Sequence, residues 1–320
     1  RLEGRDATRV LNRVCANDVD VRLGRIVYTQ WLNERGGIEA DLTVTRLAED
    51  SFLIVTAVTS EVRDFHWLKG HIPGDAHCVL VNVTSAMGVI SLMGPASRAL
   101  LQSLTPANLA SEAFPFATSR EIELGYGLVR ASRISYVGEL GWELYVPTEF
   151  AAGVYDEIVA AGEAFGLEHA GYHALDSLRI EKAYRHWGHD ITDQDSPLEA
   201  GLGFAVKFDK PGFIGREALL RQKESGIRKR LIQFRLRDPE PLLYHYEPIW
   251  LGDEIAGYVT SGSYGHSLGG AVGLGYVPTS LLPDFPELPT PFEIEVAGVR
   301  VPAEASIRPM YDPGGKRVRN

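Results

Sequence analysis

Hydrophobic and polar residues alternate most clearly in residues 133–146, RISYVGELGWELYV. The alternation predicts a strand at Arg133–Tyr136 and a second strand at Trp142–Val146, joined by a tight turn. Two glycines in the turn, Gly138 and Gly141, indicate a hairpin or a close approach of the backbone to another strand. The segment is therefore predicted to form a β-hairpin.

The second of these strands has two chemically different faces. Glu143 and Tyr145 fall on one face, and the other face is hydrophobic, with Trp142, Leu144 and Val146. A carboxylate among such residues needs a partner if it is buried, because an unpaired buried charge is unfavourable. Two interpretations follow. Glu143 is either exposed or paired within the fold, as most strand carboxylates are, or it binds a ligand.

The first half of the chain predicts a mixture of helices and strands. A helix is expected at Gly4–Val14 with Asp6 as its cap, and another from the capping residue Thr148 to about Phe165. A third long helix is expected at Ala170–Ala183. Turn residues separate the strand-like runs of an antiparallel meander, at Arg25–Leu32, Ile38–Leu47 and Ser51–Val58.

From about Arg228 the pattern changes to short strand-like pieces separated by Gly and Pro, without a convincing helix. These pieces are Leu231–Leu236, Glu254–Ser261, Ala271–Val277, Phe292–Val296 and Val299–Ala303. They predict an all-β domain, a small barrel or sandwich. Because 320 residues exceed what one hydrophobic core usually serves, we expect two domains, at residues 1–227 and 228–320.

Composition argues against several classes of protein. A net charge of −10 disfavours a nucleic-acid-binding protein, and no hydrophobic run approaches the length of a membrane-spanning helix. Only Cys15 and Cys78 occur, so a reducing compartment is expected, the cytoplasm or, in a eukaryote, the mitochondrial matrix. No signal peptide is visible and the first residue is not Met, so we expect the chain to be part of something longer.

Asp41 stands out among the polar residues of the predicted meander. It shares one face of its strand with two threonines, Thr43 and Thr45, while Leu42 and Val44 share the other. The simplest interpretation is a half-buried sheet whose polar face meets water. A ligand-binding face is the alternative.

The segment ALDSLRIEKAYRHWGHD carries further candidates on and after the third long helix. Arg179 is a helix arginine that would ordinarily pair with Asp176 or Glu181. Trp187 would ordinarily belong to a core or an interface. The cluster His186, His189 and Asp190 lacks the paired spacing of zinc sites, so no metal is predicted.

The segment SYVGELGWELYVP resembles the Y-x-G-E-x-G-x-E motif of the glycine-cleavage T-protein (aminomethyltransferase) family. In that family the motif holds the pterin ring of tetrahydrofolate, and Tyr136 and Glu143 match the pterin-contacting residues. A carboxylate suits this role because it accepts two parallel bonds from the adjacent N–H donors of a pterin edge.

Two further segments carry the same resemblance. YTQWLNERGGIEADLTV is similar to the family's Y…LNE.GGI..DL.V motif, in which Tyr28 matches a pterin-flanking tyrosine and Asp41 the favoured catalytic residue. A carboxylate there stabilises a cationic iminium and can take or hold a proton. SLRIE resembles the family's LRLE segment, which assigns Arg179 to the folate site, and Trp187 falls where the family often has an aromatic residue.

Thr56 marks a departure from the T-protein pattern, which usually has a ligand-contacting Asn at this position. Together with RIEKAYRHWG and TSGSYGHSLGGAVGLGYVP, it resembles a subgroup, the folate-binding C-terminal half of dimethylglycine and sarcosine dehydrogenases or oxidases. The resemblance implies an α+β fold, with a T-protein-like cloverleaf of two interleaved α/β subdomains and a C-terminal barrel-like domain. It also adds Thr56 to the expected folate-binding residues.

In those flavoproteins an FAD module oxidises an N-methyl amine to an iminium, and the T-protein-like module passes the methylene to tetrahydrofolate. The resemblance therefore implies tetrahydrofolate as cofactor, a small N-methyl amine or iminium as donor, and 5,10-methylenetetrahydrofolate as product. This chain has no G-x-G-x-x-G after a strand. FAD is thus expected only in a missing domain, fused or separate.

Two alternatives belong to the same family. A free-standing aminomethyltransferase or folate-dependent demethylase would need no flavin partner, but an aminomethyltransferase would have to dock a lipoyl carrier. Non-enzymatic folate-binding proteins of iron–sulfur maintenance typically carry Lys-Gly-Cys-x-x-Gly-Gln-Glu where this chain has KFDKPGFIGRE. The absence of Cys from that segment, and the presence of Asp41, disfavour the non-enzymatic alternative.

Overall fold

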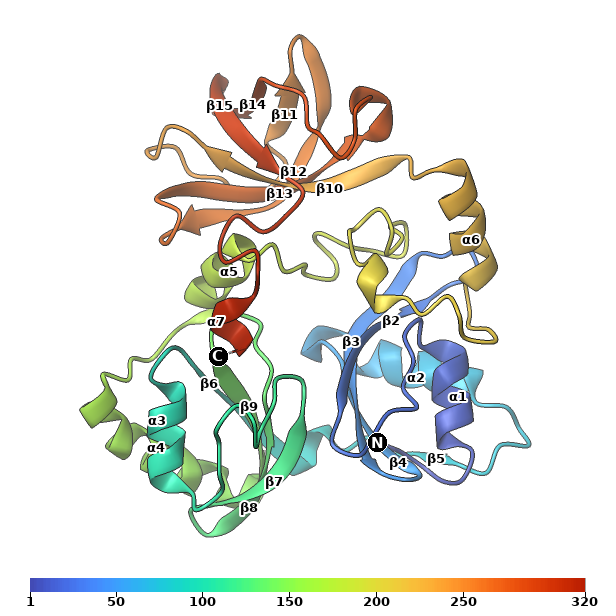
Figure 1. The fold of residues 1–320 in the computed structure, drawn as a ribbon, viewed down its shortest axis with the longest axis vertical. Helices are drawn as coiled ribbons and strands as arrows, with labels where there is room; N and C mark the ends of the chain where they lie inside the picture. Colours follow the sequence, from blue (N-terminus) through green and yellow to red (C-terminus); the bar gives the residue numbers. More distant parts are fainter. Residues whose placement is uncertain (320) are drawn as a thin grey trace. The chain divides into compact units, whose positions relative to one another are not determined.

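The computed structural model describes residues 1–319 (Figure 1). The chain divides into two compact units. Unit 1 comprises Arg1–Thr29, Asp41–Ala170 and the residues from Gly315 on. Unit 2 comprises Gln30–Ala40 and Gly171–Gly314. Two strands, β2 (Ile26–Leu32) and β3 (Ile38–Ala48), begin in one unit and end in the other. The described residues contain no helix with the length and hydrophobicity needed to cross a bilayer.

The first sheet has the strand order β2-β3-β4-β1-β5, with β1 (Leu2–Glu3), β4 (Ser51–Val55) and β5 (Val79–Leu80). Helices α1 (Ala7–Val14) and α2 (Glu61–His71) belong to unit 1, as does most of this sheet. Apolar side chains of the strands, among them Leu2 and Phe52, are fully buried. The predicted meander is confirmed in its strand order, and β3 pairs antiparallel with β4. Its third strand, predicted to reach Val58, ends at Val55, because Val58 begins a 3-10 turn.

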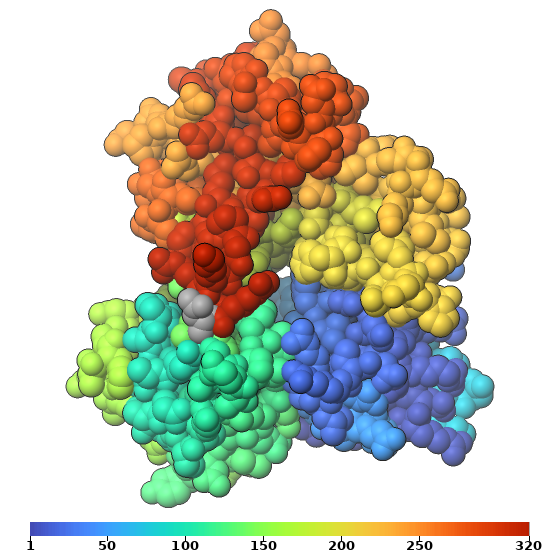
Figure 2. All heavy atoms as spheres, in the orientation of Figure 1, coloured from blue at the N-terminus to red at the C-terminus, as the bar shows by residue number. Residues whose placement is uncertain are grey.

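The second sheet, order β6-β9-β8-β7, is entirely in unit 1. Its strands are β6 (Met87–Met93), β7 (Ser119–Leu124), β8 (Gly127–Ser132) and β9 (Gly141–Pro147). Helices α3 (Ser97–Leu104) and α4 (Ala151–Gly162) pack on one face. The space-filling view shows the atoms coloured for the segment around α3 on the surface of this part of the molecule (Figure 2). The predicted hydrophobic face of β9 is confirmed, because its three apolar residues lie in this core: Trp142, Leu144 and Val146.

The predicted strand at Arg133–Tyr136 is wrong. β8 ends at Ser132, and the N–H of Ile134 bonds to the carbonyl of Ser132 at 3.0 Å, a tight turn that stops the strand. The guanidinium of Arg133 donates to the carbonyl of Phe114 at 2.6 Å, so this residue is buried by contacts outside the sheet.

The predicted close backbone approach is confirmed at Gly141, the first residue of β9. A Cβ at this position would lie 2.4 Å from the carbonyl oxygen of Leu92 on β6. Gly138 has φ of +75°, in the left-handed region that favours glycine. The chain between β8 and β9 is therefore longer than the tight turn that was predicted, but both glycines are required by its backbone.

The two predicted helix caps form no capping hydrogen bond. Asp6 precedes α1, but its carboxylate accepts the N–H of His77 at 2.8 Å. Thr148 begins a 3-10 turn before α4 and donates its hydroxyl to the carbonyl of Ser85 at 3.0 Å. Both side chains therefore bond to a backbone group distant in sequence, and Asp6 also accepts the guanidinium of Arg9 at 3.3 Å.

Unit 2 contains α5 (Tyr172–Glu181), α6 (Arg216–Ser225) and a closed barrel with the order β10-β13-β12-β11-β14-β15. The barrel strands are β10 (Lys229–Leu236), β11 (Pro248–Leu251), β12 (Glu254–Gly265), β13 (Gly270–Pro278), β14 (Phe292–Val296) and β15 (Val299–Ser306). The rings of Phe234 and Phe292 pack edge to face in its core, 5.4 Å apart. The predicted α+β class and the C-terminal barrel are confirmed, although β11 was too short to be predicted.

Candidate functional site

Glu143 lies at the centre of the polar face of the second sheet. Strand pairing places it opposite Ser91 of β6 and Ser132 of β8. Tyr145, two residues later on β9, donates its hydroxyl to Oε2 of Glu143 at 2.6 Å. The predicted placement of Glu143 and Tyr145 on one face is therefore confirmed, and the carboxylate is half-buried with a hydrogen-bond donor already in place.

Burial dominates the electrostatics of this pair. Loss of solvent raises the pKa of Glu143 above its ordinary value, and the hydrogen bond from Tyr145 acts in the opposite direction. The pKa of Tyr145 is raised by burial and then by the neighbouring Glu143 charge, so its hydroxyl remains a donor at neutral pH. A desolvated carboxylate of this kind is stabilised by further N–H donors from a ligand.

Tyr136 lies in the irregular connection between β8 and β9, on the N-terminal side of Glu143. Tyr136 is half-buried. On either side of it, the N–H of Val137 donates to the hydroxyl of Ser135 at 3.2 Å, which bends the backbone. Tyr136 is therefore carried by a bent segment and not by the strand that the sequence predicted.

The other predicted residues of unit 1 come from the first sheet. Tyr28 is a half-buried residue of β2, and its carbonyl accepts the side-chain amide of Asn17 at 2.9 Å. Asp41 is a half-buried residue of β3, the strand between β2 and β4. Thr56 directly follows β4, whose last residue, Val55, pairs with Thr43. These three residues thus come from adjacent strands or their ends.

Arg179 lies in unit 2 and is the hub of a buried polar network. Its guanidinium donates to Asp176 at 2.7 Å, to Asp190 at 2.6 Å and to Ser261 of β12 at 3.0 Å. The side chain is 2% exposed, and that of Asp190 is 0% exposed. Pairing with Asp176 is confirmed, while Glu181 instead accepts backbone N–H groups of the turn after β12. The network connects α5, the segment after it, and the barrel.

Trp187 lies between two partners of Arg179, which donates to the carbonyl of Tyr184 and to the carboxylate of Asp190. Its indole N–H donates to the carbonyl of Ile38 at 2.9 Å, and it is half-buried. The N–H of His186 bonds to the Asp190 carboxylate at 3.0 Å, and the pKa of His186 is lowered by burial and by the Arg179 charge. Residues 1–319 include no group of three or more His, Cys, Asp or Glu placed to hold a metal ion.

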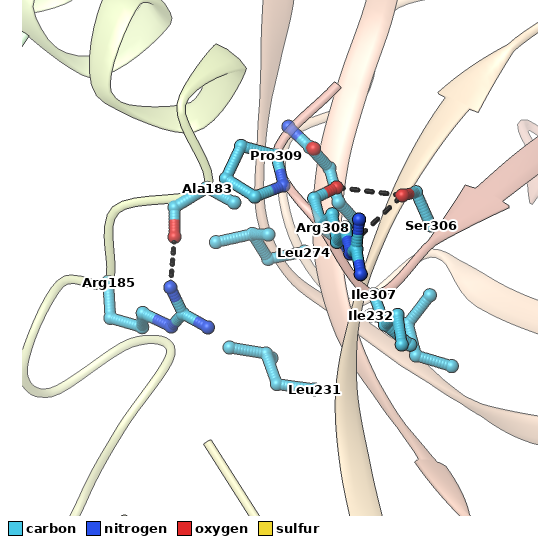
Figure 3. A pocket seen from close by; sticks show the side chains of 10 residues that line it. Ala183, Arg185, Leu231, Ile232, Leu274, Ser306, Ile307, Arg308 and Pro309 are labelled. Atoms are coloured by element: carbon cyan, nitrogen blue, oxygen red, sulfur yellow. Dashed lines mark hydrogen bonds between the residues drawn. The ribbon is translucent and has the colours of Figure 1, made fainter. Parts of the chain in front are cut away.

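A small pocket also lies in unit 2 (Figure 3). Arg185 lines it beside barrel residues such as Leu231 and Ser306, and its guanidinium donates to the carbonyl of Ala183 at 2.7 Å. None of the predicted site residues lines this pocket. We therefore do not assign it to folate.

The structure adds two candidate residues, Tyr145 and Asp190, through their hydrogen bonds to Glu143 and Arg179. The signal for Tyr145 was present, because strand alternation puts it on the face of Glu143. Asp190 had no comparable signal. It was considered only as part of a metal cluster, and its contact with Thr260 of the barrel, 70 positions away, is not visible in any local pattern.

Residues 1–210 match the family model described as the GCVT N-terminal domain. Residues 229–312 match the model described as the glycine cleavage T-protein C-terminal barrel domain. The chain belongs to the glycine cleavage T-protein family. Proteins of this family bind tetrahydrofolate, and the chain is an aminomethyltransferase-type domain.

Individual relatives agree with this family. The chain is 43% identical over 319 residues to 4-methylaminobutanoate oxidase (formaldehyde-forming) of Paenarthrobacter nicotinovorans, covering 99% of this chain and 38% of that protein. It is 40% identical over 339 residues to human mitochondrial sarcosine dehydrogenase, and the match covers 99% of this chain and 36% of that protein. It thus spans well under half the length of these two relatives.

Among solved structures, the glycine cleavage system aminomethyltransferase T of Bartonella henselae is similar to the chain. The TM-score is 0.85 at 27% sequence identity, and the match covers 96% of this chain and 82% of that one. The resemblance recognised from the sequence motifs is therefore confirmed, both for the family and for the fold.

Proposed function

We propose that this chain transfers a methylene group to tetrahydrofolate, as the folate module of an FAD-dependent N-methyl amine dehydrogenase or oxidase, and that the product is 5,10-methylenetetrahydrofolate. The observation that carries the proposal is the Glu143 carboxylate, desolvated on the polar face of the second sheet and hydrogen-bonded to Tyr145. Such a carboxylate fits the pterin ring, whose edge offers adjacent N–H donors.

Asp41 is the proposed catalytic residue. When bound, tetrahydrofolate supplies the nucleophilic nitrogens that accept the one-carbon unit. The Asp41 carboxylate stabilises the positive charge of the iminium donor and holds the proton released as the nitrogen–carbon bond forms. Its half-buried position on β3 supports this role because burial strengthens such charge interactions.

The remaining family-matched residues are proposed to bind the cofactor. Tyr28 and Tyr136 contribute aromatic contact to the pterin, and Thr56 replaces the polar Asn that is usual in T-proteins. In unit 2, Arg179 and Trp187 are the proposed folate residues. The network around Arg179 supports a role in holding the Trp187 segment in one conformation.

The donor is proposed to be an iminium derived from a small N-methyl amine. Two of the relatives are named as oxidising enzymes for N-methylated compounds, and they are similar to this chain over 99% of its length. Since the chain spans only 38% and 36% of those proteins, FAD is assigned to a fused or separate flavin domain.

A free-standing aminomethyltransferase is the second candidate, because the chain shares its fold with the Bartonella henselae enzyme at a TM-score of 0.85. The two candidates differ in the donor. An aminomethyltransferase would accept the one-carbon unit from an aminomethylated lipoyl carrier protein, whereas the folate module of a flavoprotein would accept it from an oxidised N-methyl amine.

The experiment supplies both donors separately. The chain is mixed with tetrahydrofolate and a flavin-dependent N-methyl amine oxidase acting on a ¹³C-methyl substrate, and labelled 5,10-methylenetetrahydrofolate is followed against the same mixture without the chain. A parallel reaction uses an aminomethylated lipoyl carrier. Acceleration with the amine donor alone supports the proposal. Acceleration with the carrier alone supports the second candidate, and acceleration with neither contradicts both.

A further inference from the structure

Tyr145 is linked to Glu143 by more than sequence proximity. The two side chains lie on the same face of β9, and the Tyr145 hydroxyl lies 2.6 Å from Oε2 of Glu143. Tyr145 is only 6% exposed. Its ring is held by the sheet, and Val89 and Arg130 lie opposite it on the two paired strands. A side chain with so little freedom offers its hydroxyl in one direction.

We propose that Tyr145 is a positioning residue that orients the Glu143 carboxylate and keeps it ionised for folate binding. The inference rests on the proposed function, because it concerns how the same site recognises its cofactor. Tyr145 itself is not assigned a contact with folate.

The hydrogen-bonding capacity of a carboxylate makes this arrangement workable. An ionised carboxylate has about four lone-pair positions, and Tyr145 occupies one of them on Oε2. The remaining positions are sufficient for two parallel N–H bonds from a pterin edge. The terminal torsion of a glutamate is soft, so without Tyr145 the carboxylate plane would be free to turn. The hydrogen bond therefore removes an ordering cost that folate binding would otherwise bear.

Tyr145 is the neighbouring side chain that influences the pKa of Glu143. The residues opposite Glu143, Ser91 and Ser132, carry no charge. On the same face, Arg130 of β8 is paired with Glu121 of β7 at 2.7 Å. Burial raises the pKa of Glu143, and the Tyr145 hydrogen bond is what opposes this rise.

Replacing Tyr145 with phenylalanine keeps the ring and removes the hydroxyl. The pKa of Glu143 then rises further, so the carboxylate becomes protonated at a higher pH. A protonated carboxyl presents a donor to the pterin N–H groups, and folate affinity falls. We expect the acid limb of the affinity–pH profile to move to higher pH and the affinity at neutral pH to fall about ten-fold, as for loss of a hydrogen bond to a charged group.

The test is calorimetric titration with tetrahydrofolate at a series of pH values from acidic to neutral, because burial raises the pKa of Glu143 above its ordinary value. Wild type is compared with Tyr145→Phe and with Tyr155→Phe, a matched variant whose hydroxyl contacts His169 at 2.7 Å on the exposed side of α4. Only Tyr145→Phe should shift the acid limb. An unchanged profile would overturn the proposal, as would a uniform loss of affinity with an unmoved limb.

A second measurement separates this inference from the proposed function. The carboxyl carbon of Glu143, assigned with Glu143→Gln, is titrated by NMR in ligand-free wild type and Tyr145→Phe. Failure of the wild type to bind folate refutes the proposed function, while equal Glu143 pKa values refute the positioning role. If Tyr145→Phe does not fold, 3-fluorotyrosine at position 145 supplies a stronger donor, and the Glu143 pKa must then fall.

Discussion

Nη1 of Arg179 lies 2.6 Å from Oδ2 of Asp190, and neither side chain is more than 2% exposed. The same carboxylate group of Asp190 accepts the N–H of His186 and the hydroxyl of Thr260, the latter on β12. One buried ion pair therefore holds together a helix, the segment carrying Trp187 and a barrel strand. Removal of either partner leaves an uncompensated charge in the interior.

Replacing Arg179 with methionine is expected to lower the free energy of unfolding by about 3–5 kcal/mol, because Asp190 is left buried without its cation. Urea denaturation followed by fluorescence measures this. Lys207→Ala is the control, since Lys207 and Asp209 form an exposed pair at 3.1 Å that contributes at most about 1 kcal/mol. A loss below about 1 kcal/mol for the methionine variant would show that the pair is not structural.

The backbone approach at Gly141 gives a second stability prediction. A Cβ there meets the Leu92 carbonyl at 2.4 Å and forces β6 away, so Gly141→Ala should cost about 1–3 kcal/mol. Gly153→Ala is the matched control. Gly153 is a residue of α4 with no atom within 4 Å of its added Cβ, and alanine should stabilise the helix by up to about 1 kcal/mol. Equal melting temperatures for the two variants would contradict this account.

The raised pKa of Glu143 predicts a stability effect with a definite sign. Since its folded-state pKa exceeds the ordinary 4.5, the folded protein binds the proton more tightly than the unfolded chain. The Glu143 contribution to the free energy of unfolding therefore falls as pH rises from the unfolded pKa through the folded one. Glu143→Gln should thus melt at a higher temperature than wild type at neutral pH, and the difference should shrink below the unfolded pKa.

Glu123→Gln controls for the loss of a negative charge, because Glu123 is an exposed residue of β7 on the same sheet. Its melting temperature should follow that of the wild type across the pH range. A Glu143→Gln variant that is less stable than wild type at neutral pH would mean that the ionised carboxylate stabilises the fold.

Asp41→Asn tests the proposed division between binding and chemistry. The amide keeps the shape but loses the charge, so tetrahydrofolate affinity should stay within about two-fold while labelled methylene capture falls about 10²–10³-fold. Asp50→Asn, at the exposed turn between β3 and β4, should behave like wild type. Undiminished capture by Asp41→Asn would remove Asp41 from the catalytic role.

Local patterns were sufficient to predict the faces of β9. Alternation with a period of two is a property of the strand itself, and it placed Glu143 with Tyr145 and the apolar residues on the opposite side. It could not predict where β8 ends. The segment at Arg133 is held by the carbonyls of Phe114 and Arg319, which are 19 and 186 positions away. Contacts of that range leave no periodic trace in the sequence.

The candidate site shows the same division. Pairing of Arg179 with Asp176 follows from helical spacing, but its bond to Ser261 spans 82 positions and could not be predicted. The assignments of Asp41 and Tyr28 to folate come from the motif resemblance, because half-burial on a strand is common to many ordinary sheet residues.

The most direct measurement is calorimetric titration of the purified chain with tetrahydrofolate, beside Glu143→Gln and the control Glu123→Gln. The account predicts binding by the wild type and the control, and a loss of about 100-fold in Glu143→Gln, because its amide presents a donor where the pterin N–H groups need an acceptor. Absence of binding to the wild type, or wild-type affinity in Glu143→Gln, would contradict the claim that Glu143 recognises the pterin.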